Sequence, residues 1–432
     1  MPEYRKKRRN KIFSSTSRGK KVNRTTKNHR EDIKMTSDYK PKAKKSQEKN
    51  NMRVVRGKKL EQKRKFKNFS LFVACALVII MCSQIIFPAG IIQTVKNTIA
   101  IIGTGSYPIE LDSSDTVNVQ PMGNYFYVLS GAQISAYSNS GKKLFSHAHG
   151  FENPVLKTSK WGAILFEQGE TDAMIFSLNG LENSITTEHS IITASISNAG
   201  AYALVTESDT YACTVSVFNK YGKNLYEWYS AEDIVNNVAI SPNTKKIAVS
   251  TFKASGGEFN SSLKVLSFKS ADPEFSTEYT GTLVYDINSS AKGSFLITTS
   301  NSLEFIKWNN YKKKTYKNDY NVSHIRSASH GTVAVFGRES DPTDNKLAVF
   351  TSGGKLKYEY DFKGIISDIR LFGGHIYCMS DTDIYLVDNT GKVLRQASSG
   401  FGGVKIVVGG TNIALSVTDN KIEKIKLEEI SK

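Results

Sequence analysis

A unit of about forty residues recurs along residues 105–432, and this repeat constrains the fold more than any other feature of the chain. Each unit holds a strand, a turn of small residues or Gly, a very apolar second strand, a polar loop, a third strand ending in a Gly or Asn turn, and a fourth strand. A period near forty with four strands per unit is typical of a β-propeller. The sequence therefore predicts an all-β fold.

The second and third strands of the units are the easiest to recognise. The expected second strands are Tyr125–Leu129, Ala163–Phe166, Ala201–Val205, Lys246–Ser250, Ser294–Thr298, Thr332–Phe336, His375–Met379 and Asn412–Val417. The expected third strands are Gln133–Tyr137, Ala173–Leu178, Cys213–Phe218, Leu263–Phe268, Leu303–Trp308, Lys346–Phe350, Asp383–Val387 and Lys421–Lys426. Glycine follows five of these third strands, at the place where a short hairpin needs a positive φ: Gly141, Gly180, Gly222, Gly354 and Gly391.

Eight second strands predict eight four-stranded blades, with seven blades as the alternative. A large β-sandwich is a less favoured fold, because the repeat has so regular a period. The last unit has no fourth strand before the chain ends at Lys432. We expect the segment Tyr107–Leu111, which precedes the first unit, to supply that strand and so to remove an open sheet edge.

An uncharged apolar stretch, Phe69–Phe87, has the length that a helix needs to cross about 30 Å of hydrocarbon. A buried soluble helix is a poorer interpretation, because the stretch is apolar all round. A cleaved signal peptide would not follow so long a leader. Basic residues crowd the N-terminal flank, whereas Lys96 is alone on the other side. The flanking residues are Lys58, Lys59, Lys63, Arg64, Lys65 and Lys67. The positive-inside rule then predicts a cytoplasmic N-terminus and an extracytoplasmic propeller.

The positive charge of the chain lies almost wholly in its first 67 residues. The chain has 58 Lys and Arg and 40 Asp and Glu; residues 1–67 hold 26 and 6 of them, a net charge of +20, which leaves −2 for the rest. This tail lacks the apolar residues of a core, so we expect disorder. We favour a role in setting topology over binding of anionic lipid headgroups, and nucleic acid is the least favoured partner. The predicted domains are a tail (1–67), a transmembrane helix (68–88), a linker (89–104) and a propeller (105–432).

Three segments of the chain resemble a known family: the YPIEL strand (Tyr107–Leu111), HAHGFENPVLKTSKWGAILFEQG (His147–Gly169) and IITASISNAGAYALVTESDTYACTVSVFNKYGKNLYEWYS (Ile191–Ser230). Together with the single anchor, they are similar to the uncharacterised membrane-anchored propellers of Gram-positive bacteria called domain of unknown function 5711. The resemblance covers roughly residues 100–430. It implies a quinoprotein-like propeller and assigns no activity or residue role.

Motifs for catalysis and cofactor binding are absent from the sequence. No nucleophile elbow, phosphate-binding loop or zinc-protease motif occurs. His147 and His149 alternate along one strand, but no third metal ligand is evident. Only three tryptophans are present, too few for a docking motif in each blade, which disfavours a quinone oxidoreductase. Cys213 and Cys378 leave a disulfide between them as an open alternative.

Charge separates the two kinds of connecting loop. Connections between second and third strands open on one face of a propeller, and turns between third and fourth strands open on the other. The first set is acidic and contains Glu167, Glu170, Asp172, Glu207, Asp209, Glu339, Asp341, Asp344, Asp381 and Asp383. The second set is basic and contains Lys142, Lys143, Lys220, Lys223, Lys312, Lys313, Lys314, Lys317, Lys355, Lys357 and Lys392. We expect the basic turns to look toward an anionic bilayer and the acidic loops toward a partner, a cationic ligand or Ca²⁺; solvated turns that simply favour charged residues are the alternative.

The sequence favours a non-catalytic binding scaffold or sensor at the cell envelope, with no cofactor and with an envelope protein or wall component as its partner. The alternative is an envelope enzyme with its site in the central mouth of the propeller. That enzyme would need ionisable residues that converge around the ring axis.

Overall fold

The computed structural model describes residues 67, 69–71, 73–74, 91–111, 118–255, 257–290, 293–328, 331–380, 382–400, 403, 405–410 and 412–430. The predicted basic tail and nearly all of the predicted transmembrane helix Phe69–Phe87 lie outside these residues, as do Lys58, Lys59, Lys63, Arg64 and Lys65. Lys67 is described, and it is helical and exposed. None of the helices in the described ranges is long and apolar enough to cross a bilayer.

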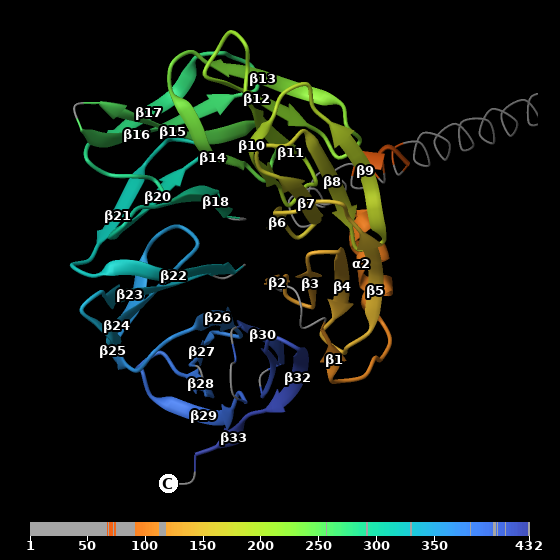
Figure 1. The fold of residues 1–432 in the computed structure, drawn as a ribbon, viewed down its shortest axis with the longest axis vertical. Coiled ribbons are helices and arrows are strands. Elements are labelled where there is room, and N and C mark those ends of the chain that lie inside the picture. Colours follow the sequence, from red (N-terminus) through yellow and green to blue (C-terminus); the bar gives the residue numbers. More distant parts are fainter. Residues whose placement is uncertain are drawn as a thin grey trace, which may run out of the picture. The chain divides into compact units, whose positions relative to one another are not determined.

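Eight antiparallel sheets follow one another along the chain, as the repeat predicts, and they form a ring of blades (Figure 1). The seven-blade and sandwich alternatives are therefore wrong. We number the blades I to VIII in chain order. Blade I has β2 (Asn118–Pro121), β3 (Tyr125–Leu129), β4 (Gln133–Ser138) and β5 (Lys143–Ala148); blade II has β6 (Pro154–Thr158), β7 (Gly162–Glu167), β8 (Asp172–Ser177) and β9 (Gly180–Thr186); blade III has β10 (Ile191–Ile196), β11 (Tyr202–Thr206), β12 (Cys213–Phe218) and β13 (Asn224–Ser230); blade IV has β14 (Ile234–Ile240), β15 (Lys246–Ser255), β16 (Glu258–Ser267) and β17 (Pro273–Tyr279).

The second half of the ring repeats this arrangement. Blade V has β18 (Asp286–Ser290), β19 (Ser294–Thr298), β20 (Ser302–Lys307) and β21 (Lys313–Lys317); blade VI has β22 (Asn321–Ala328), β23 (Gly331–Arg338), β24 (Asp341–Phe350) and β25 (Leu356–Lys363); blade VII has β26 (Asp368–Phe372), β27 (His375–Met379), β28 (Asp383–Val387) and β29 (Val393–Ser398); blade VIII has β30 (Lys405–Gly410), β31 (Ile413–Val417) and β32 (Lys421–Lys426).

The N-terminal segment closes the ring, as predicted. Strand β1 (Ile109–Glu110) pairs with β32 and becomes the fourth strand of blade VIII, with Ile109 opposite Ile422. The chain end adds a short fifth strand, β33 (Glu428–Glu429), outside β29 of blade VII. Both ends of the propeller chain therefore lie in sheet pairing, which leaves fewer unpaired strand edges.

The first strand of each blade lies nearest the axis of the ring, and neighbouring blades meet there through these strands (Figure 1). The fourth strands are outermost, and their residues alternate between exposed and covered, as in β25. The second strands are almost fully buried because both faces pack against other blades, as in β3 and β19. This explains why the second strands have the most apolar sequences.

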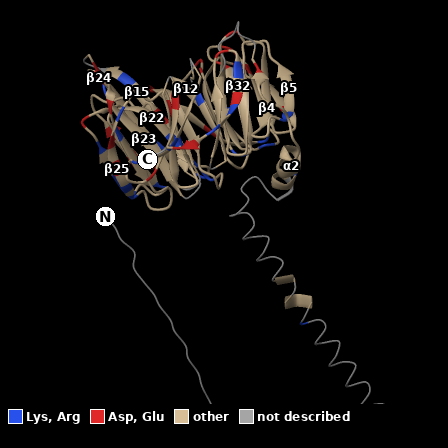
Figure 2. Ribbon diagram, turned by 90° about the horizontal axis from the view of Figure 1, so that it is seen from below, with Lys and Arg blue, Asp and Glu red and all other residues tan. Residues whose placement is uncertain are grey.

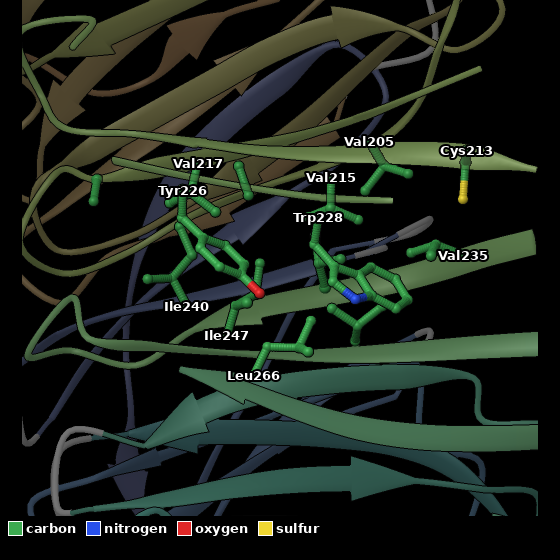
Figure 3. Packing of buried hydrophobic residues seen from close by; sticks show 14 residues of the cluster. Val205, Cys213, Val215, Val217, Tyr226, Trp228, Val235, Ile240, Ile247 and Leu266 are labelled. Atoms are coloured by element: carbon green, nitrogen blue, oxygen red, sulfur yellow. The ribbon is translucent and has the colours of Figure 1, made fainter. Parts of the chain in front are cut away.

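Apolar side chains fill the spaces between the blades. Between blades III and IV, Tyr226 and Trp228 of β13 pack with Ile240, Ile247 and Leu266 of the next sheet (Figure 3). Each fully buried aliphatic or aromatic side chain of this kind contributes roughly 1.5–3 kcal/mol relative to its exposure to water. Cys213 lies in this layer and Cys378 lies in blade VII; both are buried and free, so the disulfide alternative between them is wrong.

The hairpin glycines have the backbone conformation that their positions predict. Gly141, Gly180, Gly222, Gly354 and Gly391 all have positive φ, between 75° and 110°. At Gly354 a Cβ atom would come within 2.4 Å of the Phe305 ring of the preceding blade. Glycine is therefore needed there both for the turn and for the contact between blades.

Helix α2 (Ile91–Ile101) lies in the segment predicted as a linker, and it precedes the closing strand. Figure 2 shows it at one face of the blades. Ile101 packs against the apolar layer between blades I and II. Downstream, Gly105 donates its N–H to the Ser140 carbonyl, and a Cβ atom at Gly105 would come within 2.0 Å of the Gly141 backbone. The chain therefore joins the ring at the third-to-fourth-strand turn of blade I.

Candidate functional site

The predicted acidic residues occupy connections between second and third strands, and these connections open on one face of the ring. We call this set the acidic face: Glu170, Asp172, Glu207, Asp209, Glu339, Asp341, Asp344 and Asp383. Of the other two predicted members, Asp381 lies outside the described residues, and Glu167 ends β7 and accepts the N–H groups of Glu152 and Asn153. Glu170, Asp172, Glu207 and Asp209 are exposed. No three metal-ligating side chains gather at one point among the described residues, here or elsewhere.

Blade VI uses its part of the acidic face for internal contacts. The Asp344 carboxylate pairs with Lys363 at 2.5 Å and with Arg338 at 3.4 Å, and it accepts a hydrogen bond of 3.0 Å from the Tyr320 hydroxyl. These contacts hold the pKa of Asp344 below its usual range. Asp341 accepts hydrogen bonds from the N–H and hydroxyl groups of Thr343. In blade II, Asp172 accepts a hydrogen bond of 2.6 Å from the Thr186 hydroxyl. The freest carboxylates of the acidic face are therefore Glu170, Glu207 and Asp209, which are exposed in blades II and III.

The predicted basic turns lie on the opposite face, together with α2. Lys142 donates hydrogen bonds of 2.9 and 2.8 Å to the carbonyl groups of Ala100 and Ile102 at the C-terminal end of α2. A lysine there satisfies carbonyls that have no partner within the helix and opposes the negative end of its dipole. Lys142 was predicted to face a membrane, but in this structure it anchors α2 to blade I.

Some other lysines of this group contact a neighbouring side chain, and most of the group is exposed. The ammonium of Lys313 pairs with Glu304 at 3.2 Å, and Lys143 and Lys220 lie over the rings of Tyr137 and Tyr221. Lys220 is partly buried. The exposed members are Lys143, Lys223, Lys312, Lys313, Lys314, Lys317, Lys355, Lys357 and Lys392. Lys317 ends β21 and pairs with Ser302, so it lies at the end of that strand away from the turn. We call the other eight exposed lysines the basic face. Turns between third and fourth strands open on one side of the ring, the side on which Lys142 of blade I contacts α2, and Figure 2 shows α2 at one face of the blades.

The two histidines that were considered as metal ligands have separate roles. The His147 ring packs edge-on against Phe176. His149 is buried, and its Nε2 atom lies 2.9 Å from the Ser130 carbonyl oxygen. The two rings are thus used in packing and in a loop hydrogen bond.

The largest gathering of ionisable side chains near the ring axis was not predicted from the sequence. Asp368, at the start of β26, is 1% exposed and lies between two arginines. Its carboxylate pairs with Arg326 of β22 at 2.8 Å and with Arg370 of its own strand at 3.0 Å, and it accepts the N–H of Ile406 in β30 at 3.1 Å. One buried carboxylate therefore joins the innermost strands of blades VI, VII and VIII.

The cations around Asp368 outnumber it. Arg370 donates to the carbonyl groups of Ile369 and Ile406, and Arg326 donates to that of Ile325. Lys405, the first residue of β30, donates one hydrogen bond of 3.5 Å to Asn118 Oδ1 and none to any other described residue. We call Arg326, Asp368, Arg370 and Lys405 the axial cluster.

Burial and mutual repulsion act on these cations. Burial lowers the pKa of Arg370 to about 10, and nearby Arg326 also lowers it. Burial is the main cause of a lowered pKa at Lys405 as well, with Arg326 and Arg370 acting in the same direction. The pKa of His324, whose Nε2 lies 3.0 Å from the Ser367 carbonyl oxygen, is lowered by burial and by Arg326. His324 is therefore neutral at pH 7, and the axial cluster carries a net charge of +2.

A common register explains how residues far apart in sequence meet. Asp368 and Lys405 each lie opposite the fifth residue of the second strand of their blade, and Arg326 and Arg370 each lie opposite the third. These two positions, opposite the third and the fifth residue of the second strand, are two levels along the ring axis. In blades I, II and V polar residues occupy the same levels: Asn118, Gln120, Lys157, Asp286 and Asn288. Aligning the first strands of the repeats would have revealed these positions, whereas only second and third strands are apolar enough to stand out.

A second pair of charged residues lies in the same two levels. Asp286 of blade V is influenced by Lys157 of blade II, which lowers its pKa, but burial has the larger effect and raises it overall. Counting these two, the eight innermost strands hold four cations and two carboxylates. The surplus of positive charge therefore belongs to the axial cluster.

A surface pocket between blades IV and V is lined by Lys246, Trp308 and Asn243. The Lys246 ammonium is fully engaged there, because it pairs with Glu274 at 2.6 Å and donates to the Trp308 carbonyl and the Tyr311 hydroxyl. Lys307 also lines this pocket and is exposed, so the charge there is a single solvated lysine rather than a buried cluster.

Comparisons with known proteins give a family and similar solved structures. Residues 104–427 match the model of a family described as "Family of unknown function (DUF5711)". The chain is similar to the crystal structure of BamB from Moraxella catarrhalis, with 12% identity and a TM-score of 0.48, over 75% of this chain and 99% of that one. No curated protein matches the sequence.

Proposed function

Because the chain belongs to the DUF5711 family, to which no function is assigned, we propose a role from the molecule itself: a single-pass, membrane-anchored propeller that serves as a non-catalytic binding scaffold or sensor at the cell envelope. The N-terminal tail lies in the cytoplasm next to anionic lipid headgroups, and the propeller is extracytoplasmic. The basic face is turned to the bilayer. The acidic face is turned away, toward an envelope protein or wall component.

The observation that carries this orientation is an apolar stripe on α2. Val95, Ile99 and Ile102 are 50%, 62% and 67% exposed. Val95 and Ile99 are four residues apart and lie on one side of α2. Ile102 directly follows the helix, and its N–H donates to the Ile99 carbonyl at 3.2 Å, so its side chain extends the same stripe. Ile101 contacts the propeller instead. A stripe of large apolar side chains beside exposed lysines is typical of a helix that lies in a membrane interface.

The sequence distance between the predicted membrane helix and α2 supports the same orientation. The apolar stretch ends at Phe87 and α2 begins at Ile91. Four residue steps span about 14 Å when fully extended. A bilayer that contains Phe69–Phe87 would therefore lie close to α2 and the basic face.

The exposed carboxylates of the acidic face supply the partner-binding part of the proposal. Glu170, Asp172, Glu207 and Asp209 project from neighbouring blades II and III on the face away from α2. A cluster of one sign of charge on a nearly neutral domain steers a partner of opposite charge. We therefore expect a cationic surface or polymer on the partner.

Fluorophore labelling at α2 tests the proposed orientation. In the full chain with Cys75 and Cys82 changed to Ala, Ile99→Cys and Asp209→Cys would each carry an environment-sensitive fluorophore and be reconstituted into liposomes. We expect blue-shifted emission and quenching by a lipid-soluble quencher at position 99 only. Position 209, on the acidic face, is the matched control.

Equal exposure to water at the two positions would contradict the membrane-facing orientation. The side of the membrane is tested separately with an impermeant maleimide on intact cells that express Asp209→Cys. We expect labelling before lysis. Labelling only after lysis would place the propeller in the cytoplasm and overturn the proposed localisation.

A catalytic role in the central mouth is the alternative, and the axial cluster is the observation in its favour. The nearest hydroxyl to His324 is that of Ser323, at 3.3 Å from Nδ1, and this hydroxyl already donates to the Val335 carbonyl. The axial cluster and the adjacent His324 thus hold three cations, one engaged carboxylate and an imidazole. Lys405 has the lowered pKa of an amine nucleophile, but its ammonium bonds to Asn118 and to no described carboxylate or imidazole that could act as its base. We therefore prefer binding to catalysis.

A further inference from the structure

We propose that the axial cluster is a binding site for a small anion that carries a carboxylate or phosphate group, held by Arg326, Arg370 and Lys405. The site does not depend on the orientation of the propeller relative to a membrane. It rests on which charged groups the three innermost strands β22, β26 and β30 bring together.

The first argument is the imbalance of charge. A purely structural ion cluster pairs each buried cation with a carboxylate, because an unpaired buried charge is costly. Here Arg326 and Arg370 share Asp368, and Lys405 beside them pairs with no carboxylate. Asp286, the other carboxylate of the innermost strands, is influenced by Lys157. An anion bearing one or two charges would neutralise the surplus.

The second argument is that the surplus lies on accessible groups. Asp368 is 1% exposed, whereas the Arg326 side chain is 35% exposed. Arg326 uses only Nη1 and Nη2 toward described residues, and its guanidinium has further N–H groups. Lys405 has a single long hydrogen bond. The cluster thus offers donors from two strands to an incoming ligand, while its carboxylate is already satisfied.

The third argument is chemical fit. Guanidinium groups bind carboxylates and phosphates through paired N–H donors, and an ammonium adds a point charge. Arg370 is held in place by the carbonyls of Ile369 and Ile406, so little of its freedom remains to be lost on binding. The partial burial that lowers the pKa of Lys405 also weakens competition from water.

Calorimetric titration of the full chain in detergent micelles tests the site, with inorganic phosphate in one arm and succinate in the other, at constant ionic strength in chloride. We expect saturable binding in at least one arm. Lys405→Met should weaken it about tenfold or more, as expected for loss of a charge-assisted hydrogen bond. Lys424→Met, an exposed position on β32 of the same blade, is the matched control and should bind as the wild type.

The two arms distinguish the sources of the anion: phosphate alone indicates a phosphoryl ligand, and succinate alone indicates a carboxylic acid. The Lys405 side chain makes one long hydrogen bond between strands, to Asn118 of β2, so its loss should leave the fold intact, which a circular-dichroism spectrum checks. Absence of binding in both arms would overturn the proposal, and so would equal affinity of the wild type and Lys405→Met.

Discussion

Two groups of innermost strands, which we call arcs, connect neighbouring blades near the ring axis through different kinds of side chain. In the charged arc, formed by β22, β26 and β30, Asp368 joins three blades through ion pairs and one backbone N–H. In the amide arc, formed by β14 and β18, Asn236 and Asn237 donate to the carbonyl groups of Val284 and Tyr285, which immediately precede β18. Both arcs tie neighbouring blades together near the ring axis.

The amide arc demonstrates that charge is not required for this purpose. Asn236 donates at 2.9 Å to Val284 and accepts at 2.6 Å from the Ser250 hydroxyl, so its side chain is satisfied at both ends without any net charge. The charged arc satisfies its carboxylate but keeps surplus cations. This difference is why we assign binding to the charged arc and a structural role alone to the amide arc.

Removing the carboxylate of the charged arc should have the largest effect. Asp368→Asn leaves Arg326 and Arg370 close together without their anion, and breaking one partner of a buried ion pair costs about 3–5 kcal/mol. We expect a loss of that size in the free energy of unfolding, measured by urea titration of the full chain with tryptophan fluorescence. Asp419→Asn, in the exposed turn before β32, is the control.

An unchanged stability of Asp368→Asn would contradict the role of this carboxylate as the link between the blades. If phosphate or succinate restored part of the lost stability, the bound anion would be replacing the missing charge. That result would connect the structural and binding roles of the charged arc, because ligand binding to the folded state stabilises it.

The amide arc should respond less strongly. Asn236→Ala removes hydrogen bonds to Val284 and Ser250 and leaves their polar groups without those partners, which costs about 1–3 kcal/mol for a buried group. We expect the free energy of unfolding to fall by an amount near the lower end of this range, because Asn236 is only partly buried. Asn301→Ala, at an exposed position, should change the free energy of unfolding by less than about 0.5 kcal/mol. A loss as large as that of Asp368→Asn would remove the distinction between the arcs.

Much of the ring could be predicted from sequence because its determinants are local. Apolar second strands such as Tyr125–Leu129 and hairpin glycines such as Gly354 carry their pattern within a few residues, and closure by Tyr107–Leu111 follows from the missing fourth strand. Helix α2 escaped prediction, because its sequence continues the apolar stretch and has no acidic first turn or basic last turn to mark its limits.

The axial cluster could not be predicted from local pattern, because it depends on which strands become neighbours. Arg326 and Asp368 are 42 residues apart, and nothing near either residue indicates the other. The same limit applies to Lys313, which was assigned to the basic face but pairs with Glu304 across two strands. Charge counts along the loops therefore cannot reveal individual contacts such as this one.

The smallest expected effect concerns Asp286, which lies at the edge of the amide arc. Burial raises its pKa above the ordinary value of 3.8, so the folded chain binds a proton there more tightly than the unfolded chain does. The protonated carboxyl therefore adds to the free energy of unfolding. This contribution is fully present below about pH 3.8, the pKa in the unfolded chain, and is lost as the pH rises through the higher pKa of the folded chain. Ionised Asp286 is therefore a destabilising group at neutral pH, in contrast to Asp368.

Asp286→Asn should accordingly be slightly more stable than the wild type at about pH 7 and equal to it at about pH 3, because asparagine resembles the protonated acid. Urea titrations of the full chain at the two pH values measure the difference. The sign is the decisive result: a less stable variant at neutral pH would mean that attraction by Lys157 outweighs burial. Asp286 would then be a stabilising ion pair like those of Asp368, and the contrast between the two arcs would be one of degree rather than of kind.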